Sequence, residues 1–454
     1  MATQTLRCER HGESTRLTCV ECNQPICPKC LVRTEVGLKC ESCAKAVAAP
    51  AAALALLDRP SRKPLYLGAA GVAVLVVAAV AIFARPGGDG DGIPPPLPPV
   101  GQWVDSTNEA NAGTTTATAL ADGRVLVVGG GSGAVVLADA RIFDLVTSSW
   151  RDTGSLSDAR RGHQAVLLAD GRVLVTGGRG ADAPDPITSA EVFDPRTEGW
   201  ARVGPMGTAR LGHSLTVLRD GRALAAGGGN PASPESSAEL FNPATGTWSG
   251  AGSMNSPRFE HTATLLENDE RVLFVGGIGP ITGGAGPQRT TELYVAARGG
   301  PGAFLRSNDL TEARSNHTAV GLPDGRVLVA GGVGGPAADL SLATVELFDP
   351  KAGAWGIDDP MSITRTGASA TLLADGRVLV AGGETVNRGS RRSLDSSEVY
   401  AGAESWRSAG DMGCPRSEHA AVRLGDGSVL AVGGDFIQPG LQPQPKSCAV
   451  RYRP

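Results

Sequence analysis

The chain has 454 residues, a formal net charge of −4 at pH 7, 62 glycines, 31 prolines and 9 cysteines. This length exceeds that of one ordinary domain. Residues 86–454 carry more acidic than basic side chains, which argues against nucleic acid as a partner. Seven of the cysteines lie before residue 44, so we expect the N-terminal segment to have a chemistry of its own.

The N-terminal segment, residues 1–46, contains four pairs of metal-ligating residue types, and two residues separate the members of each pair. These are Cys8, His11, Cys19, Cys22, Cys27, Cys30, Cys40 and Cys43. Pairs with this spacing form tight knuckles around tetrahedral zinc, and thiolates with an imidazole suit that metal. We therefore predict two structural zinc ions whose ligand sets leave no open position for hydrolysis. A disulfide framework is the alternative, but it has no place for a histidine.

The spacing from Cys8 to Cys30 resembles that of the B-box zinc finger. The chain departs from that pattern at Cys40 and Cys43, where B-boxes usually carry histidines. The resemblance implies a cross-brace, in which the first and third pairs hold one ion and the second and fourth pairs hold the other. It also implies that the module contacts a protein partner.

After a linker at residues 47–63, residues 64–85 are predicted to form a transmembrane helix. Leu65 to Ala84 contain no charged residue, Asn or Gln. At about 1.5 Å per residue they span roughly 30 Å, the thickness of the bilayer hydrocarbon. A buried core helix and a cleaved signal peptide are the alternatives. Basic residues flank the N-terminal end, so the positive-inside rule predicts a cytoplasmic N-terminus and an extracytoplasmic C-terminal domain. Residues 86–100, rich in Pro and Gly, form a spacer.

Residues 101–454 repeat one pattern seven times. A clear copy has Arg160 and His163, a hydrophobic run ending in Gly177-Gly178, then Glu191 and Trp200. The first glycines of the successive Gly-Gly pairs stand at 129, 177, 227, 276, 331, 382 and 433. A period of about 50 residues suits one four-stranded blade. We therefore predict an all-β, seven-bladed β-propeller. Trp103 precedes the first unit and should complete the last blade, which would close the ring.

This pattern resembles the kelch repeat, whose propeller is also the scaffold of galactose oxidase. That enzyme uses copper held by tyrosine and histidine ligands, with a Cys-linked tyrosine. In this chain Tyr294, Tyr400 and Tyr452 occupy a repeated slot that other units fill with Phe, and no histidine is spare. We therefore predict that the protein is not an enzyme and has no catalytic residues.

Ionisable residues recur at fixed positions in the repeat, as scaffold residues do. They are the histidines 163, 213, 261, 317 and 419, the arginines 160, 210, 258, 314, 365 and 416, and the glutamates 191, 239, 292, 346 and 398. We expect Arg–Glu ion pairs around the ring, either within a blade or between neighbours. Unit seven places Arg416 opposite Val450. The same unit contains Cys414 and Cys448, which are either free or joined in a disulfide.

The loops after each Gly-Gly pair are long and differ between units, and they should emerge together on one face. Function in repeat proteins usually lies where the repeats differ, so this face is our candidate binding surface. It includes Arg388, Arg391 and Arg392, with Asp182 and Asp185 on another blade. Solvated loops without a ligand are the alternative.

We predict a single-pass membrane protein whose external propeller binds protein or carbohydrate and whose cytoplasmic zinc module binds a protein. The alternatives are a structural or adhesive surface protein and a propeller-based carbohydrate-active enzyme.

Overall fold

The computed structural model divides the chain into two units, Met1–Gly92 and Ile93–Pro454. In the second unit it describes residues 101–106, 113–131, 135–181, 185–230, 232–266, 270–281, 284–335, 339–402, 406–439, 444–445 and 448–454. In the first unit it describes four strands, β1 (Leu6–Arg7), β2 (Ser14–Thr15), β3 (Leu31–Thr34) and β4 (Gly37–Cys40). β1 pairs with β2, and β3 with β4, both antiparallel.

The predicted zinc module and membrane segment lie almost wholly outside the described residues. Cys40 ends β4, and the other seven predicted ligands fall on residues that are not described. Residues 47–63, 64–85 and 86–100 are also outside that set. Within the described part of the chain, no helix is long and apolar enough to cross a membrane. The zinc, membrane and topology predictions therefore remain predictions.

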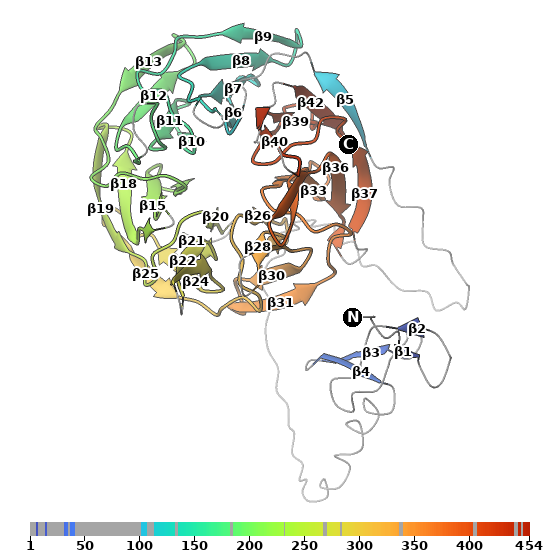
Figure 1. The fold of residues 1–454 in the computed structure, drawn as a ribbon. Coiled ribbons are helices and arrows are strands. Elements are labelled where there is room, and N and C mark those ends of the chain that lie inside the picture. Colours follow the sequence, from blue (N-terminus) through green and yellow to red (C-terminus); the bar gives the residue numbers. More distant parts are fainter. Residues whose placement is uncertain are drawn as a thin grey trace, which may run out of the picture. The chain divides into compact units, whose positions relative to one another are not determined.

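The second unit is built of four-stranded antiparallel sheets arranged as blades around a central opening (Figure 1). The first three are β6 (Thr116–Ala119), β7 (Val125–Val128), β8 (Ala140–Asp144), β9 (Ser149–Asp152); β10 (Gln164–Leu167), β11 (Val173–Thr176), β12 (Ala190–Asp194), β13 (Gly199–Arg202); and β14 (Ser214–Val217), β15 (Ala223–Ala226), β18 (Ser237–Asn242), β19 (Thr247–Ser253).

The next three blades are β20 (Thr262–Leu265), β21 (Arg271–Val275), β24 (Thr291–Val295), β25 (Ala303–Arg306); β26 (Thr318–Gly321), β27 (Val327–Ala330), β30 (Val345–Asp349), β31 (Ala354–Asp358); and β32 (Ser369–Leu372), β33 (Val378–Ala381), β36 (Ser396–Tyr400), β37 (Trp406–Asp411). The seventh is β38 (Ala420–Arg423), β39 (Val429–Val432), β42 (Ala449–Arg453) and β5 (Gln102–Ser106). The described part of this unit is thus all-β, as predicted.

The ring closes through β5, the strand that precedes the first blade. It pairs antiparallel with β42, with Trp103 opposite Tyr452, and so becomes the outer strand of the seventh blade. The Trp103 indole N–H donates to Ser397 Oγ at 2.8 Å, which also ties β5 to the sixth blade. This confirms the predicted role of the segment around Trp103. Because the last blade holds strands from both ends of the domain, the ring is fastened by hydrogen bonds and packing.

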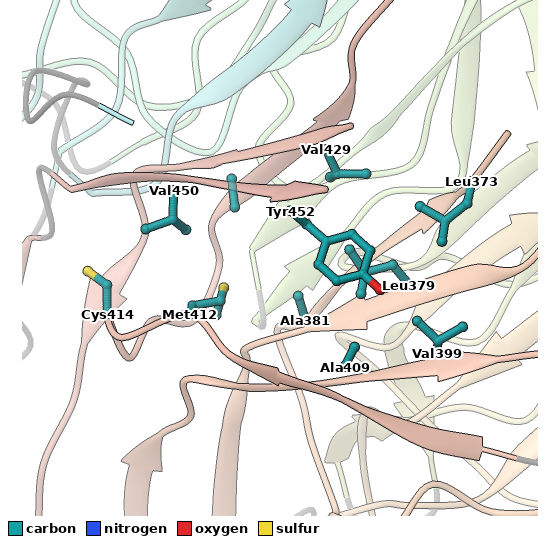
Figure 2. Packing of buried hydrophobic residues seen from close by; sticks show 11 residues of the cluster. Leu373, Leu379, Ala381, Val399, Ala409, Met412, Cys414, Val429, Val450 and Tyr452 are labelled. Carbon is teal, nitrogen blue, oxygen red and sulfur yellow. The ribbon is translucent and has the colours of Figure 1, made fainter. Parts of the chain in front are cut away.

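Hydrophobic packing lies between the blades, because each sheet is apolar on both faces. The second strands, such as β7 and β11, are buried along their whole length. Every pair of neighbouring blades shares a cluster of buried residues. Figure 2 shows the cluster that joins the sixth and seventh blades, where Leu379 and Val399 of one pack toward Tyr452 of the other. Burying both faces of every sheet makes the ring one continuous core.

Short strands also form in the loops that follow the Gly-Gly pairs. They are β16 (Gly229–Asn230), β17 (Ser233–Pro234), β22 (Ile278–Ile281), β23 (Gly284–Pro287), β28 (Val333–Gly334), β29 (Leu340–Ser341), β34 (Glu384–Asn387), β35 (Ser390–Ser393), β40 (Asp435–Phe436) and β41 (Gln444–Pro445). β28, β29, β34 and β35 form one sheet that joins the loops of the fifth and sixth blades.

Candidate functional site

The repeated arginines and glutamates form buried ion pairs inside the blades. The guanidinium to carboxylate distances are 2.9 Å for Arg160–Glu191, Arg210–Glu239 and Arg258–Glu292, 3.0 Å for Arg314–Glu346 and 2.7 Å for Arg365–Glu398. The pairing expected from the sequence is therefore confirmed, and each pair lies within one repeat unit. Each arginine carbonyl also accepts a Gly N–H from the preceding blade, as Arg160 does from Gly130 at 2.9 Å. These residues build the scaffold.

The repeated histidines join neighbouring blades. Their Nε2 atoms lie 2.8 to 3.0 Å from hydroxyl oxygens of the preceding blade, in the pairs His163–Thr116, His213–Thr176, His261–Ser214, His317–Thr262 and His419–Ser369. Burial, together with the charge of the nearby arginine, lowers the pKa of His163, His317 and His419 to about 3. Burial also holds the pKa of His213 and His261 well below the usual value. All five are therefore neutral near pH 7, which suits a structural role.

The residue before each histidine slot has a left-handed backbone. The seven positions are Gly113, Gly162, Gly212, Glu260, Asn316, Gly367 and Glu418, with φ between 50° and 79°. Five hydrogen bonds link six of them, from Gly162 to Glu418. In each bond the amide N–H of one residue donates to the carbonyl of its counterpart in the preceding blade, at 2.8 to 3.3 Å. We call these seven residues the belt. The belt circles the central opening of the ring, which we call the channel, at the end where the first strands begin. The Gly-Gly loops emerge at the same end, because the bridges Arg161–Arg179 and Ser417–Asp435 pair residues beside the belt with residues of these loops.

A cavity of about 610 Å³ opens at the belt. Its wall includes Glu260, Asn316 and Glu418 of the belt, together with Arg161 and Phe259 from the adjoining segments. Glu260 and Glu418 are exposed to the channel. The cavity thus combines carboxylates, an amide, a guanidinium and an aromatic ring, a mixture found in binding sites for polar ligands.

The two belt carboxylates have perturbed acidity, because protein surrounds them even though channel water reaches them. This enclosure, together with the charge of Glu418, raises the pKa of Glu260 to about 7. Burial also raises the pKa of Glu418, with Asp435 and Glu384 adding to the effect. Arg391 and a hydrogen bond with the Asn316 side chain act in the opposite direction.

The variable loops contribute less charge than the sequence suggested. Arg388, Arg391 and Arg392 are exposed, but Arg391 forms an ion pair with the buried Glu384, so it is partly neutralised. Asp182 lies outside the described residues. The loops are also linked: the Ser393 N–H donates to the Ile437 carbonyl at 2.9 Å, which joins the sixth and seventh blades. The basic patch is therefore smaller than predicted.

Sequence reasoning missed the belt, because we treated every residue inside the repeat as scaffold. A signal was present: the position between the repeated Arg and His holds Gly in four units but Glu260, Asn316 and Glu418 in the others. We assigned function to the loops alone and overlooked this departure. The alternative left open for Cys414 and Cys448 is resolved, since the two are joined in a disulfide.

The channel mouth does not fit a copper site of the galactose oxidase type. Within the described ranges, no group of three or more His, Cys, Asp and Glu side chains is arranged to hold a metal ion. His163 faces Thr116, and Tyr294 and Tyr400 pack against Phe304 and Trp406 in the outer strands. The donors at the mouth are carboxylates and an amide rather than the tyrosine and histidine set that such a site needs.

Comparisons with known proteins identify the fold. The kelch motif matches residues 160–207, and no curated protein matches the sequence. Among solved structures, the chain is similar to a novel fungal alcohol oxidase with catalytic diversity in the AA5 family, in complex with copper. The identity is 18%, the TM-score is 0.63, and the match covers 78% of this chain and 77% of the other. This likeness shows a kelch-type, galactose oxidase-like β-propeller. It also contradicts our prediction that the protein is not an enzyme, because a copper alcohol oxidase shares the fold.

Proposed function

We propose that the propeller is a ligand-binding domain, and that its ligand, a protein segment or a carbohydrate, is held at the channel mouth by Glu260, Asn316 and Glu418. The observation that carries this proposal is their backbone conformation. All three have φ between 50° and 53°, at a position that four other blades fill with glycine. A residue with a side chain is strained there, by about 1 kcal/mol or more. Such strain is typical of positions that a protein retains for function.

The side chains at these positions suit a ligand that donates hydrogen bonds. Asn316 and Glu418 are hydrogen-bonded to each other across Gly367. A Cβ added at Gly367 would lie 3.3 Å from the Glu418 Cγ and 3.5 Å from the Asn316 Nδ2, so glycine there leaves room for this pair. Sugar hydroxyls, or the amide and ammonium groups of a protein, would find acceptors in the two carboxylates.

Removing the side chains at the belt tests the proposal. In Glu260→Gly and Glu418→Gly we expect binding to weaken about tenfold or more, because each loses a charged hydrogen bond. The free energy of unfolding should stay the same or rise by up to about 1 kcal/mol, because the strain is relieved. The measurements are glycan and surface-protein arrays with the full chain, followed by titration of the best ligand.

The matched control is Ser148→Gly, because Ser148 also has a left-handed backbone, with φ of 50°, but lies in the turn between β8 and β9. It should relieve the same kind of strain without changing affinity. Unchanged affinity in both belt variants would refute the assignment of the site.

A second candidate is acid–base chemistry on a bound carbohydrate. It is favoured by the pKa of Glu260, which at about 7 suits a group that gives and takes a proton near neutral pH. Incubating the full chain with the glycans that it binds, and analysing the products by mass spectrometry, separates turnover from binding. Turnover that Glu260→Gln abolishes would establish an enzyme, whereas bound glycan recovered intact would favour the binding function.

For the rest of the chain we propose a B-box-like module of residues 1–46 that binds two zinc ions and a protein partner, and a membrane anchor at residues 64–85. The ligand spacing supports the first, and the uncharged stretch of sequence supports the second. Metal analysis of the purified chain should give two zinc ions per molecule. Protease added to intact cells should remove the propeller. Protection of the propeller would refute an extracytoplasmic location.

A further inference from the structure

The seventh blade departs from the others around its buried arginine. In five blades the guanidinium Nη2 of the buried arginine donates to the carboxylate of the repeated glutamate. It also donates to the hydroxyl of the residue two positions before that glutamate in the sequence. The hydroxyl residues are Ser189, Ser237, Thr290, Thr344 and Ser396, at 3.0 to 3.3 Å. In the seventh blade Cys448 stands in the hydroxyl slot, and Val450 stands in the carboxylate slot. The sulfur is therefore the side-chain atom that faces Arg416.

Arg416 is fully buried, and within the described part of the chain no carboxylate forms an ion pair with it. Its Nη2 lies 2.7 Å from Cys448 Sγ. Its other donors reach backbone carbonyls, those of Cys414 at 3.2 Å, Gly433 at 3.2 Å and Ala431 at 3.4 Å. Burial lowers the pKa of Arg416 to about 10. A buried cation held only by dipoles is destabilising, and an anion in contact with it would relieve that effect.

We propose that Cys414 and Cys448 form a thiol–disulfide exchange site, in which Arg416 holds the reduced Cys448 as a thiolate. The reductant is a small thiol. Because Cys414 is buried, the reaction requires local opening of this corner of the blade. The thiolate of the reductant then attacks the sulfur of Cys414, the S–S bond breaks, and the electron pair leaves on Cys448 beside Arg416. A second small thiolate attacks the mixed disulfide and leaves as the small-molecule disulfide, and Cys414 takes up one proton. Two electrons are transferred, and a stabilised leaving thiolate favours the first step.

The other ionisable groups around this corner leave the cation as the dominant charge. His419 is neutral, because burial and then Arg416 lower its pKa to about 3. Asp105 pairs in register with Val450 from β5, but it is exposed to solvent. Burial by itself opposes ionisation of a thiol. Cys448 is only half-buried, however, and its sulfur lies in contact with the guanidinium. We therefore expect the cation to lower the pKa of the Cys448 thiol by more than burial raises it.

The test is the pH dependence of Cys448 alkylation in full-length Cys414→Ser, where Cys448 has no disulfide partner. Iodoacetamide labelling is followed on the Cys448 peptide by mass spectrometry, which separates it from the N-terminal cysteines. We expect the midpoint of the rate profile to lie about one pH unit or more below the value of about 8.5 for a free cysteine. The same chain unfolded in guanidinium is the reference. A folded midpoint at or above the unfolded one would overturn the proposal.

Restoring the missing carboxylate provides a second test. In the Cys414→Ser background, Val450→Glu would neutralise Arg416 as the other blades do, so the midpoint should return toward about 8.5. Val450→Gln has the same shape without charge and should keep the acidic midpoint. With both cysteines present, Val450→Glu should shift the disulfide to dithiol ratio in a glutathione buffer about tenfold toward the disulfide, relative to Val450→Gln. Equal ratios in these two variants would also refute the role of Arg416.

Discussion

The buried Arg–Glu pairs show how single residues hold each blade together. Arg314 donates to Glu346, to the Thr344 hydroxyl and to the carbonyls of Gly331 and Thr344. Glu346 in turn accepts the N–H of Thr311 at 2.7 Å. The pair thus fastens the start of the first strand to the third strand of the same blade. Both groups are nearly inaccessible, so each depends on the other for its charge balance.

Arg314→Met should reduce the free energy of unfolding by about 3–5 kcal/mol, because it leaves the Glu346 carboxylate buried without its cation. Chemical denaturation of the purified chain measures the change. The control is Arg326→Met, which breaks an ion pair with Asp324 whose side chains are 40% and 48% exposed. An exposed pair contributes about 1 kcal/mol or less. Similar losses in the two variants would show that the buried pairs are not central to stability.

At the scale of elements, β5 is the strand that no turn connects to its own blade. Its hydrogen bonds to β42, the indole bond to Ser397 and the packing of Trp103 on Tyr452, with ring centroids 5.3 Å apart, hold it in place. An outer strand such as β31 differs, since it is the second half of a hairpin with β30. Loss of a side-chain anchor should therefore affect the two strands differently.

Trp103→Ala should reduce the free energy of unfolding by about 3 kcal/mol and accelerate hydrogen exchange at the amides of β42. Trp355→Ala is the matched control, because that indole also packs on an aromatic ring and donates a hydrogen bond, to the Asn308 carbonyl at 2.8 Å. It should cause a comparable global loss without selective exchange in β30. If β42 in Trp103→Ala and β30 in Trp355→Ala kept equal protection from hydrogen exchange, the closing role of β5 would be contradicted.

The repeat allowed the elements of the blades to be predicted, because each strand has the same turn residues and apolar pattern in every unit. The pairing among the loops could not be predicted in this way. β29 meets β34 at Leu340 and Asn387, which belong to different blades, and their sequences share no pattern. Such contacts depend on the three-dimensional approach of two loops. The belt was missed for a different reason, since its polar residues replace glycine at a position whose left-handed backbone only the structure shows.

For the whole molecule, the neutral histidines should control stability in acid. Their pKa values are lower in the folded state than the ordinary value near 6.5, so the unfolded chain binds more protons as the pH falls below 6.5. Stability is therefore fully present above pH 6.5 and is lost toward the folded pKa. Glu260 acts in the opposite sense, because its folded pKa of about 7 exceeds the ordinary value of 4.5. Its contribution is present below pH 4.5 and is lost as the pH rises through 7.

Thermal unfolding from pH 8 to pH 4 should therefore show a melting temperature that falls steadily below pH 6.5, since five histidines outweigh the two belt glutamates, whose pKa values are raised. Glu260→Gln removes one of these two opposing groups. It should raise the melting temperature at pH 8, where the wild-type carboxylate is charged, and leave it unchanged at pH 4, where that group is protonated in both states. A melting temperature that is constant between pH 6.5 and pH 4 would contradict the assignment of the histidines.

The belt also shows how such a ring can change its ligand without changing its fold. Along most of its length, each belt carbonyl accepts the amide of the next blade, so the main chain is occupied with closing the ring and recognition is left to side chains. A Cβ added at Gly212 would meet the ring of Phe259 at 3.2 Å, whereas one at Gly113 would lie 2.3 Å from backbone. A side chain at position 212 or 367 would require small shifts of neighbouring side chains, whereas one at position 113 is blocked by backbone. The ligand-binding side chains at the mouth of the channel can therefore differ while the backbone of the ring stays the same, and the strain of the left-handed backbone limits which substitutions are tolerated.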